Sequence, residues 1–262
     1  MLKTLVVLSD QIPDGWFVAH PVRVIRRPDV ASLPLAAVSA GICAQVAYLP
    51  ALLQRADGIV LATCCDQQRR AAEWLANPER VFLVNVPSTT HTEQLRAYEA
   101  ARLARWLDAL CLRAPLNAAL TEMPLPRSIQ HPAGPKIGVV GGHFPGSIAQ
   151  ADAFFQKKGL ALAWWGCEGG HGVGNVYARP NHQFYHAVQE FVRSHQLSGL
   201  VVVHTTWCDV WRLAAVRLRE VLDIPVTTWI ADDAAPLELH AQTCTRLEAF
   251  CELVVQRARE LP

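Results

Sequence analysis

Two cysteines occupy the same place in a motif that occurs twice in the chain. The pattern Cys-Asp-x-x-Arg-x-Ala-Ala begins at Cys65 and again at Cys208, each time after a hydrophobic run opened by a glycine. The aspartate is a residue type that caps a following helix. A cysteine at a helix N-terminus lies at the positive end of the helix dipole, which lowers the pKa of the thiol and favours the thiolate that binds metal. The repeat therefore predicts two pseudo-equivalent halves, each offering one metal-binding thiolate.

Three of the other six cysteines are candidates for a third ligand. Cys43 follows a glycine at the start of a predicted helix, Cys64 adjoins Cys65, and Cys167 ends a predicted strand in WWGCEGGHGVG. The remaining three fall in helical patterns with apolar neighbours and are expected to be buried packing residues: Cys111, Cys244 and Cys251.

The spacing of the cysteines leaves the metal open. The chain lacks the C-x2-C pairs usual in zinc sites and the runs of ferredoxin type. Dispersed cysteines at separate strand ends can bind either metal, so a mononuclear zinc site also remains possible; its ligands would be Cys65, Cys167, His204 and Cys208. Simple burial of small thiols is the third interpretation.

Histidines and glycines near predicted strand ends supply further candidates. His143 and His204 could donate a proton to a substrate, but for each histidine taken alone a hydrogen-bonded structural role is the favoured interpretation. Gly142 lies in GVVGGHFPGS, which follows a strand as phosphate-cradling loops do but lacks the P-loop lysine. Gly169 and Gly170, in CEGGHGVGN, would let the backbone approach a ligand closely.

Short β-branched runs alternate with helical patterns along the whole chain, which predicts an α/β fold with parallel sheets. We expect two similar Rossmann- or flavodoxin-like domains, at residues 1–115 and 136–262, joined by a proline-rich linker at 116–135. Ligands of parallel sheets bind beyond the carboxyl ends of the strands. The metal site is therefore expected in the cleft between the domains. The expected strands are 4–9, 18–25, 58–62, 81–86, 136–141, 161–165, 199–204 and 225–230, and the expected helices are 44–55, 66–76, 91–112, 147–158, 181–195, 209–222 and 237–260.

Charge and hydropathy narrow the class of protein. A formal net charge of +1 favours neither nucleic acid nor an anionic membrane as partner. No run approaches the ~18 apolar residues of a membrane helix. The N-terminal hydrophobic stretch from Leu5 to Leu8 is too short for a signal peptide, so the expected compartment is the cytoplasm.

Six segments together resemble those of a known family: 57–70 (DGIVLATCCDQQRR), 81–87 (VFLVNVP), 136–142, 165–170, 199–208 and 230–254 (IADDAAPLELHAQTCTRLEAFCELV). Through them the chain resembles the 2-hydroxyacyl-CoA dehydratase and benzoyl-CoA reductase family of iron–sulfur proteins. The resemblance implies a [4Fe–4S] cluster on Cys43, Cys65 and Cys208, with one iron open to substrate. It also implies an ATP-dependent iron–sulfur activator protein as electron donor, an acyl-CoA or other small-molecule substrate, and a homo- or heterodimer with a related subunit.

The chain also departs from the family pattern. It is shorter than the usual subunit, and the paired Cys64 and Cys65, with Cys167, would suit a larger cluster such as a double cubane. The function predicted from the resemblance is an oxygen-sensitive enzyme or enzyme subunit, a dehydratase or reductase that carries out low-potential one-electron reduction. The alternatives are a non-catalytic, cluster-bearing electron-transfer partner and a zinc- or small-molecule-binding protein.

Overall fold

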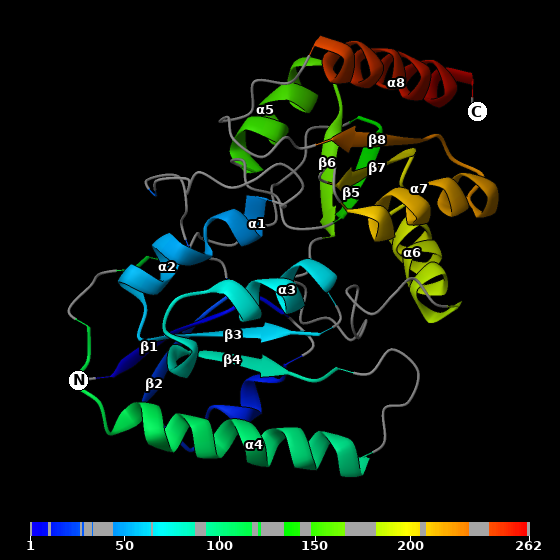
Figure 1. The fold of residues 1–262 in the computed structure, drawn as a ribbon. Helices are drawn as coiled ribbons and strands as arrows, with labels where there is room; N and C mark the ends of the chain where they lie inside the picture. Colours follow the sequence, from blue (N-terminus) through cyan, green and yellow to red (C-terminus); the bar gives the residue numbers. More distant parts are fainter. Residues whose placement is uncertain are drawn as a thin grey trace. The chain divides into compact units, whose positions relative to one another are not determined.

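The computed structural model describes most of the chain as two compact units, one within residues 1–124 and the other within 125–262. Figure 1 shows the helices and strands of both. The described residues are 2–9, 12–26, 28, 33, 44–63, 65–86, 93–116, 120–121, 134–141, 148–165, 182–204, 208–230 and 241–260.

The first unit is built on a four-stranded parallel sheet with the order β2-β1-β3-β4. In the register, Leu5 of β1 lies beside Gly58 of β3, and Ile59 of β3 lies beside Val81 of β4. All five residues of β3 are buried, as expected for a central strand covered on both faces. The strands are β1 (Lys3–Val7), β2 (Val22–Ile25), β3 (Gly58–Ala62) and β4 (Val81–Val84).

Helices cover both faces of this sheet, with α2 and α3 on one side and α4 on the other (Figure 1). The helix predicted at 44–55 is divided at Tyr48, because Pro50 cannot donate a backbone hydrogen bond and its ring obstructs a continuous helix. The helical elements are η1 (Asp14–Trp16), α1 (Ala44–Ala47), α2 (Leu49–Arg55), α3 (Asp66–Trp74), η2 (Pro78–Arg80) and α4 (Glu93–Cys111).

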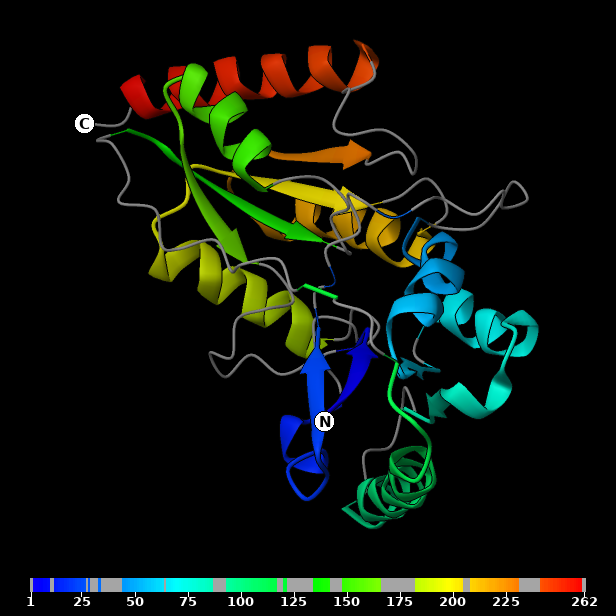
Figure 2. The ribbon, with the colours of Figure 1, turned by 90° about the vertical axis from the view of Figure 1, so that its left-hand side faces the viewer.

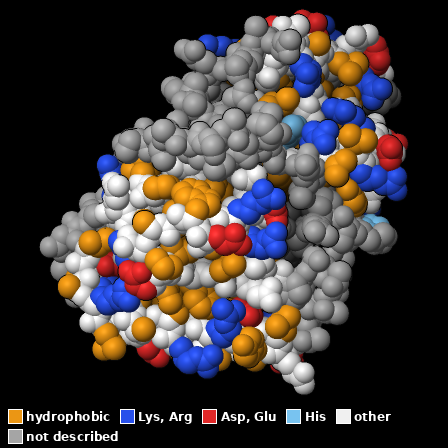
Figure 3. Space-filling view, in the orientation of Figure 1, with side chains coloured by type: hydrophobic (Ala, Val, Ile, Leu, Met, Phe, Trp, Pro, Cys, Tyr) orange, Lys and Arg blue, Asp and Glu red, His pale blue; other side chains and the backbone are white. Residues whose placement is uncertain are grey.

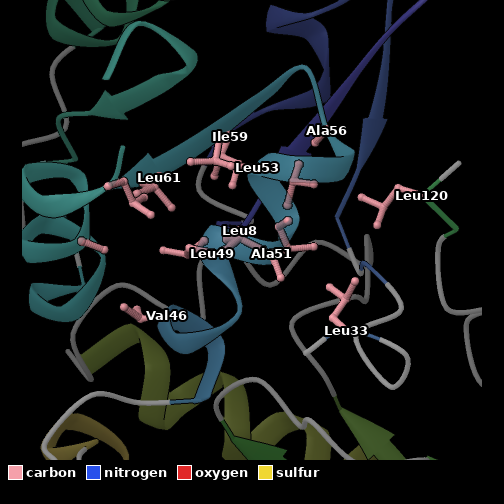
Figure 4. Packing of buried hydrophobic residues seen from close by; sticks show 14 of the residues in the cluster. Leu8, Leu33, Val46, Leu49, Ala51, Leu53, Ala56, Ile59, Leu61 and Leu120 are labelled. Atoms are coloured by element: carbon pink, nitrogen blue, oxygen red, sulfur yellow. The ribbon is translucent and has the colours of Figure 1, made fainter. Parts of the chain in front are cut away.

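The core between the sheet and α1–α3 consists of aliphatic side chains (Figure 4). Leu49 and Leu53 of α2 belong to the same buried cluster as Ile59 and Leu61 of β3. Leu120, which follows α4 by nine residues, is also buried in this cluster. The packing of Leu120 keeps the chain on the first unit beyond the end of α4.

The second unit repeats this architecture with the strand order β6-β5-β7-β8, again all parallel. Helices α5 and α8 cover one face of the sheet and α6 and α7 cover the other (Figure 2). The elements are β5 (Lys136–Gly141), α5 (Ile148–Lys157), β6 (Ala161–Trp165), α6 (His182–Ser194), β7 (Gly199–His204), α7 (Asp209–Val221), β8 (Val226–Ile230) and α8 (Ala241–Glu260).

The two units are equivalent in detail at the glycines that open their central strands. A Cβ atom on Gly58 would lie 2.7 Å from Cη2 of Trp106 in α4, and one on Gly199 would lie 2.7 Å from Cζ of Phe250 in α8. In both units the final long helix therefore packs against a strand that has no side chain at this position. The glycine of the repeated motif is explained by this close approach.

The predicted α/β class with two parallel sheets is confirmed, and each unit is Rossmann-like in having helices on both faces of its sheet. The strand predicted at 18–25 is shorter, Val22–Ile25, because residues 17–19 form a turn after η1. Among the described residues, no helix combines the length and apolar character needed to cross a membrane. A cluster site in a cleft between domains is not shown.

A buried ion pair secures the segment that leaves α4. Lys3 Nζ lies 3.6 Å from Asp57 Oδ1, and the two side chains are only 5% and 3% exposed. Lys3 also donates to the Arg113 carbonyl, and Asp57 accepts hydrogen bonds from the backbone amides of Thr4 and Leu116. Asp57 thus joins β1, β3 and the chain after α4 at the amino edge of the sheet.

We predict that Asp57→Asn lowers the free energy of unfolding by ~3–5 kcal/mol, because the buried Lys3 ammonium loses its counter-charge. Urea denaturation measures the change. Glu220→Gln is the matched control: Glu220 pairs with Arg217 on the surface, where removal of the pair costs below ~0.5 kcal/mol. Equal losses in both variants would contradict the assigned role of Asp57.

A second prediction concerns Gly141, the last residue of β5. Its φ is +153°, and a Cβ atom there would lie 2.1 Å from the Val203 carbonyl oxygen, which belongs to the neighbouring strand and cannot move aside. We expect Gly141→Ala to lower the unfolding free energy by about 3 kcal/mol or more. Gly15→Ala, where a Cβ meets nothing within 4 Å, should change it by no more than ~0.5 kcal/mol. Both changes are read from urea denaturation curves, and a mild Gly141→Ala effect would show that β5 and β7 are less closely paired here.

Candidate functional site

The strand orders place a topological switch point at the centre of each sheet. From β1 the chain runs to β2 on one side and later to β3 on the other, so the connections after β1 and β3 leave the sheet in opposite directions. The same holds for β5 and β7 in the second unit. Crevices at the carboxyl ends of such strand pairs are where open α/β sheets bind ligands. The candidate sites are therefore the edges after β1 and β3, and after β5 and β7.

Cys65 lies at this edge of the first unit, as the N-cap residue of α3. Its backbone carbonyl accepts from the Arg69 amide at 3.0 Å, the first hydrogen bond of the helix. Its side chain makes no capping hydrogen bond. The backbone of Cys65 therefore begins the helix, while its sulfur takes no part in capping it.

The pKa of the Cys65 thiol is raised, chiefly because the sulfur is buried, and the Asp66 carboxylate raises it further. The backbone amides of Gln68 and Gln67 lower the pKa, but less strongly than burial raises it. The prediction that the helix terminus makes Cys65 a thiolate is therefore wrong. Desolvation outweighs the helix dipole, and the thiol is protonated at neutral pH.

A buried glutamine bridges the two central strands just beside Cys65. Gln68 is 3% exposed; its Oε1 accepts from the Ala62 amide at 2.9 Å, and its Nε2 donates to the Leu8 carbonyl at 3.2 Å. Leu8 follows β1 and Ala62 ends β3. The side chain of Gln68 therefore satisfies the backbone groups that would otherwise face the crevice between these strands.

A second polar network joins the ends of β3 and β4. The Thr63 hydroxyl donates to Asn85 Oδ1 at 3.2 Å and accepts from the Val86 amide at 2.8 Å. The backbone amide of Asn85 donates to the carboxylate of Glu99, a residue that is 2% exposed. This carboxylate also accepts two hydrogen bonds from Arg102. These contacts hold the rim around Cys65 in a defined shape.

The connection after β1 is held by Arg26, which follows β2. Its guanidinium donates to the Ser9 and Ile12 carbonyls at 2.8 and 2.6 Å and pairs with Asp14 at 2.6 Å. Because three groups along this connection share one guanidinium, the path of the chain beyond β1 is constrained on both sides of residues 10–11. Arg26 thus holds the connection after β1 in place beside the carboxyl edge of the first unit's sheet.

In the second unit the corresponding edge carries His204 and Cys208. His204 is the last residue of β7 and is 4% exposed. Cys208 is the N-cap residue of α7, is partly exposed, and accepts from the Arg212 amide through its carbonyl at 3.2 Å. The connection from β7 to α7 therefore has the imidazole of His204 at its start and the thiol of Cys208 at its end.

The predicted site residues fall into two groups. Cys65 lies in the first unit and His204 and Cys208 lie in the second, and each is found at the carboxyl edge of its sheet. The others lie outside the described residues: Cys43, Cys64, Gly142, His143, Cys167, Gly169 and Gly170.

The three cysteines expected to be packing residues differ in their surroundings. Cys251 is 1% exposed within the α5–α8 core, and burial raises the pKa of its thiol to about 11. Cys111 and Cys244 are only partly buried, unlike the expectation. Cys111 ends α4, where burial raises the pKa of its thiol.

Two surface cavities lie away from these edges. One, of about 360 Å³, lies between the C-terminal ends of α2 and α3 and is lined by Leu53, Trp74 and Arg80. The other, also about 360 Å³, lies where α7 ends and β8 begins and is lined by Arg219 and Arg257. Both are at the amino ends of strands, the side of a parallel sheet that does not form its ligand site.

On the face drawn in Figure 3, basic and acidic side chains are interspersed, without a patch of one sign.

Sequence reasoning missed Gln68 and Arg26, which shape the first edge through contacts 60 and 17 residues away. Gln68 lies three residues after Cys65 in the repeated motif, at a position that the two copies do not share, since the second copy has Trp211 there. This difference between glutamine and tryptophan was the signal in the sequence that could have pointed to Gln68. It marks a position where the two units are not chemically equivalent.

Comparisons with known proteins find no matching family model and no matching curated protein. The solved structures that match include ZnuA, with 13% identity, coverage of 98% of this chain and 99% of that chain, and a TM-score of 0.25. They also include the laminin-binding protein Lbp of Streptococcus pyogenes, with 12% identity, the same coverages and a TM-score of 0.23. Likeness at these TM-scores transfers neither a fold nor a ligand to this chain.

The predicted membership of the 2-hydroxyacyl-CoA dehydratase and benzoyl-CoA reductase family is wrong. Neither a model of that family nor any other family model matches the chain, and no curated protein matches it. The resemblance rested on short strand–turn–helix segments, and a hydrophobic strand followed by a helix cap is a pattern that parallel α/β folds use repeatedly. The predicted iron–sulfur dehydratase or reductase activity, with its anaerobic electron transfer, rested on that family membership and is withdrawn with it.

The predicted [4Fe–4S] cofactor, and with it the larger cluster, is also wrong. The described parts of the chain contain no group of three or more His, Cys, Asp or Glu side chains placed to hold a metal.

The protonation of Cys65 is open to a direct test. We predict that alkylation of Cys65 by iodoacetamide speeds up about tenfold per pH unit from pH 6 to 8, because the reactive thiolate is a small fraction there. Asp66→Asn removes a charge that raises the pKa, so it should move the rate profile to lower pH. Glu73→Gln, an exposed acid on the same helix, is the control and should leave the profile in place. Site-resolved mass spectrometry gives the rates, and a rate that is already constant below pH 7 would identify a thiolate and refute this assignment.

Proposed function

We propose that this chain is a small-ligand-binding protein whose ligand is a thiophilic metal ion, Zn²⁺, taken at the carboxyl edges of its sheets. The observation that carries the proposal is the duplicated placement of a cysteine. Cys65 and Cys208 each form the N-cap of the helix that follows the central strand beside a switch point. A plain packing role does not require two partly exposed thiols at equivalent ligand-binding edges.

The donor chemistry supports zinc. Zinc binds cysteine sulfur and histidine nitrogen, and the second unit offers both from His204 and Cys208 on one connection. The first unit offers Cys65 beside the Thr63–Asn85 rim. These donors number fewer than the four ligands of a closed zinc site, so water or donors outside the described residues complete the coordination.

Proton release follows from the pKa of the thiol. A thiol must lose its proton to bind the metal, and the Cys65 thiol is protonated at neutral pH. Zinc binding in the first unit therefore releases a proton and strengthens as the pH rises toward the pKa of Cys65. A reducing, cytoplasmic compartment suits this function, because it keeps the thiols of Cys65 and Cys208, which form no disulfide, from oxidising.

Titration calorimetry with ZnCl₂ tests the proposal on chelator-treated protein. We expect binding with a Kd below ~10 µM and a matching rise in the thermal midpoint, because a ligand that binds only the folded state stabilises it. Cys208→Ser should weaken binding at least ~10-fold, because serine is a poor zinc ligand.

The matched control for this titration is Cys111→Ser, a partly exposed cysteine that ends α4 near Lys3 and Asp57, at the amino edge of the sheet. It should leave zinc affinity unchanged. Absence of heat and of a thermal shift at ~100 µM ZnCl₂, well above the expected Kd, would overturn the proposed function. Equal weakening in both variants would overturn the assignment of Cys208.

A further inference from the structure

The crevice between β1 and β3 is already filled by the protein's own amide group. In an open parallel sheet the central strands diverge at their carboxyl ends, and a ligand there pairs with backbone groups left free by the ladder. The two groups at this point in the first unit are the Ala62 amide and the Leu8 carbonyl. Both are paired with Gln68, at 2.9 and 3.2 Å.

The geometry of Gln68 is that of a bound carboxamide. One amide group presents its oxygen to an N–H donor and its nitrogen to a carbonyl acceptor on the two neighbouring strands. The side chain is 3% exposed, so the hydrogen bonds are shielded from water. Leaving either backbone group unpaired in a buried position would be unfavourable, which keeps the amide in place.

The second unit closes the equivalent position by different means. There β5 and β7 remain paired through Gly141 and Val203, and Gly141 lies so close that no side chain fits between the strands. The residue equivalent to Gln68 is Trp211, which packs with the hydrophobic side chains under α6 and α7. Both central crevices are thus closed from within, one by a side chain and one by the backbone.

We propose that Gln68 determines ligand size in the first unit. Its amide already pairs with the Ala62 amide and the Leu8 carbonyl, so nucleotides and dinucleotides are excluded from these backbone groups and Cys65 is left to a single ion. This inference rests on the proposed function for the identity of the ion. The closure of the crevice stands on the contacts of Gln68 alone.

Chemical rescue tests whether the amide occupies a ligand position. Gln68→Ala should lower the thermal midpoint, and acetamide, which matches the part of the side chain removed beyond Cβ, should raise the midpoint of this variant by ~3 °C or more. Wild type and Gln54→Ala, which truncates an exposed glutamine on α2, should not respond to acetamide. If Gln68→Ala does not fold, Gln68→Ser, which also removes the amide group, takes its place with the same expected response.

A ligand panel on the wild type tests the exclusion. FMN, NAD⁺ and ATP should leave the thermal midpoint unchanged, whereas ZnCl₂ raises it. A shift with any of the three nucleotides, or an equal acetamide response in all variants, would overturn the role given to Gln68. Failure of ZnCl₂ alone, with rescue by acetamide intact, would overturn the proposed function and leave the closed crevice established.

Discussion

The close approach of one long helix to a glycine at the start of the central strand is the contact on which each unit depends. A Cβ on Gly58 or Gly199 would lie 2.7 Å from an aromatic ring of α4 or α8. Only glycine allows that approach, and it brings the helix against a strand buried on its other face by α2 and α3, or by α6 and α7. The central strands are thereby enclosed on both sides, and their carboxyl ends become the place where polar groups meet solvent.

At those ends, burial decides the chemistry more than the helix dipole does. Cys65 has the helix-terminal position that normally activates a thiol, yet desolvation keeps it protonated. Neighbouring polar side chains are likewise engaged with backbone groups: Gln68 with two strands, Thr63 with the connection after β4, and Arg26 with the connection after β1. The described polar side chains at this edge are therefore largely committed to backbone groups of the protein itself.

The duplication is exact in strand order but not in helices or chemistry. Both units have the same strand order and the same cysteine N-cap, but the first has the short η1 where the second has α5, and the divided α1 and α2 where the second has α6. They differ where a ligand would enter, since an amide fills one crevice and paired backbone closes the other. Such divergence within a retained scaffold allows two units of one fold to contribute different donors.

The sequence by itself determined the alternation of strands and helices, because hydrophobic periodicity and the Pro50 break are local properties. It also determined the equivalence of Cys65 and Cys208, since a repeated motif follows a repeated strand. Only the tertiary structure decided that Cys65 is protonated, that Gln68 closes the crevice and that Lys3 pairs with Asp57, because each depends on groups 50 or more residues apart or on burial. Desolvation and long-range hydrogen bonding are properties of the packed chain, and no short pattern encodes them.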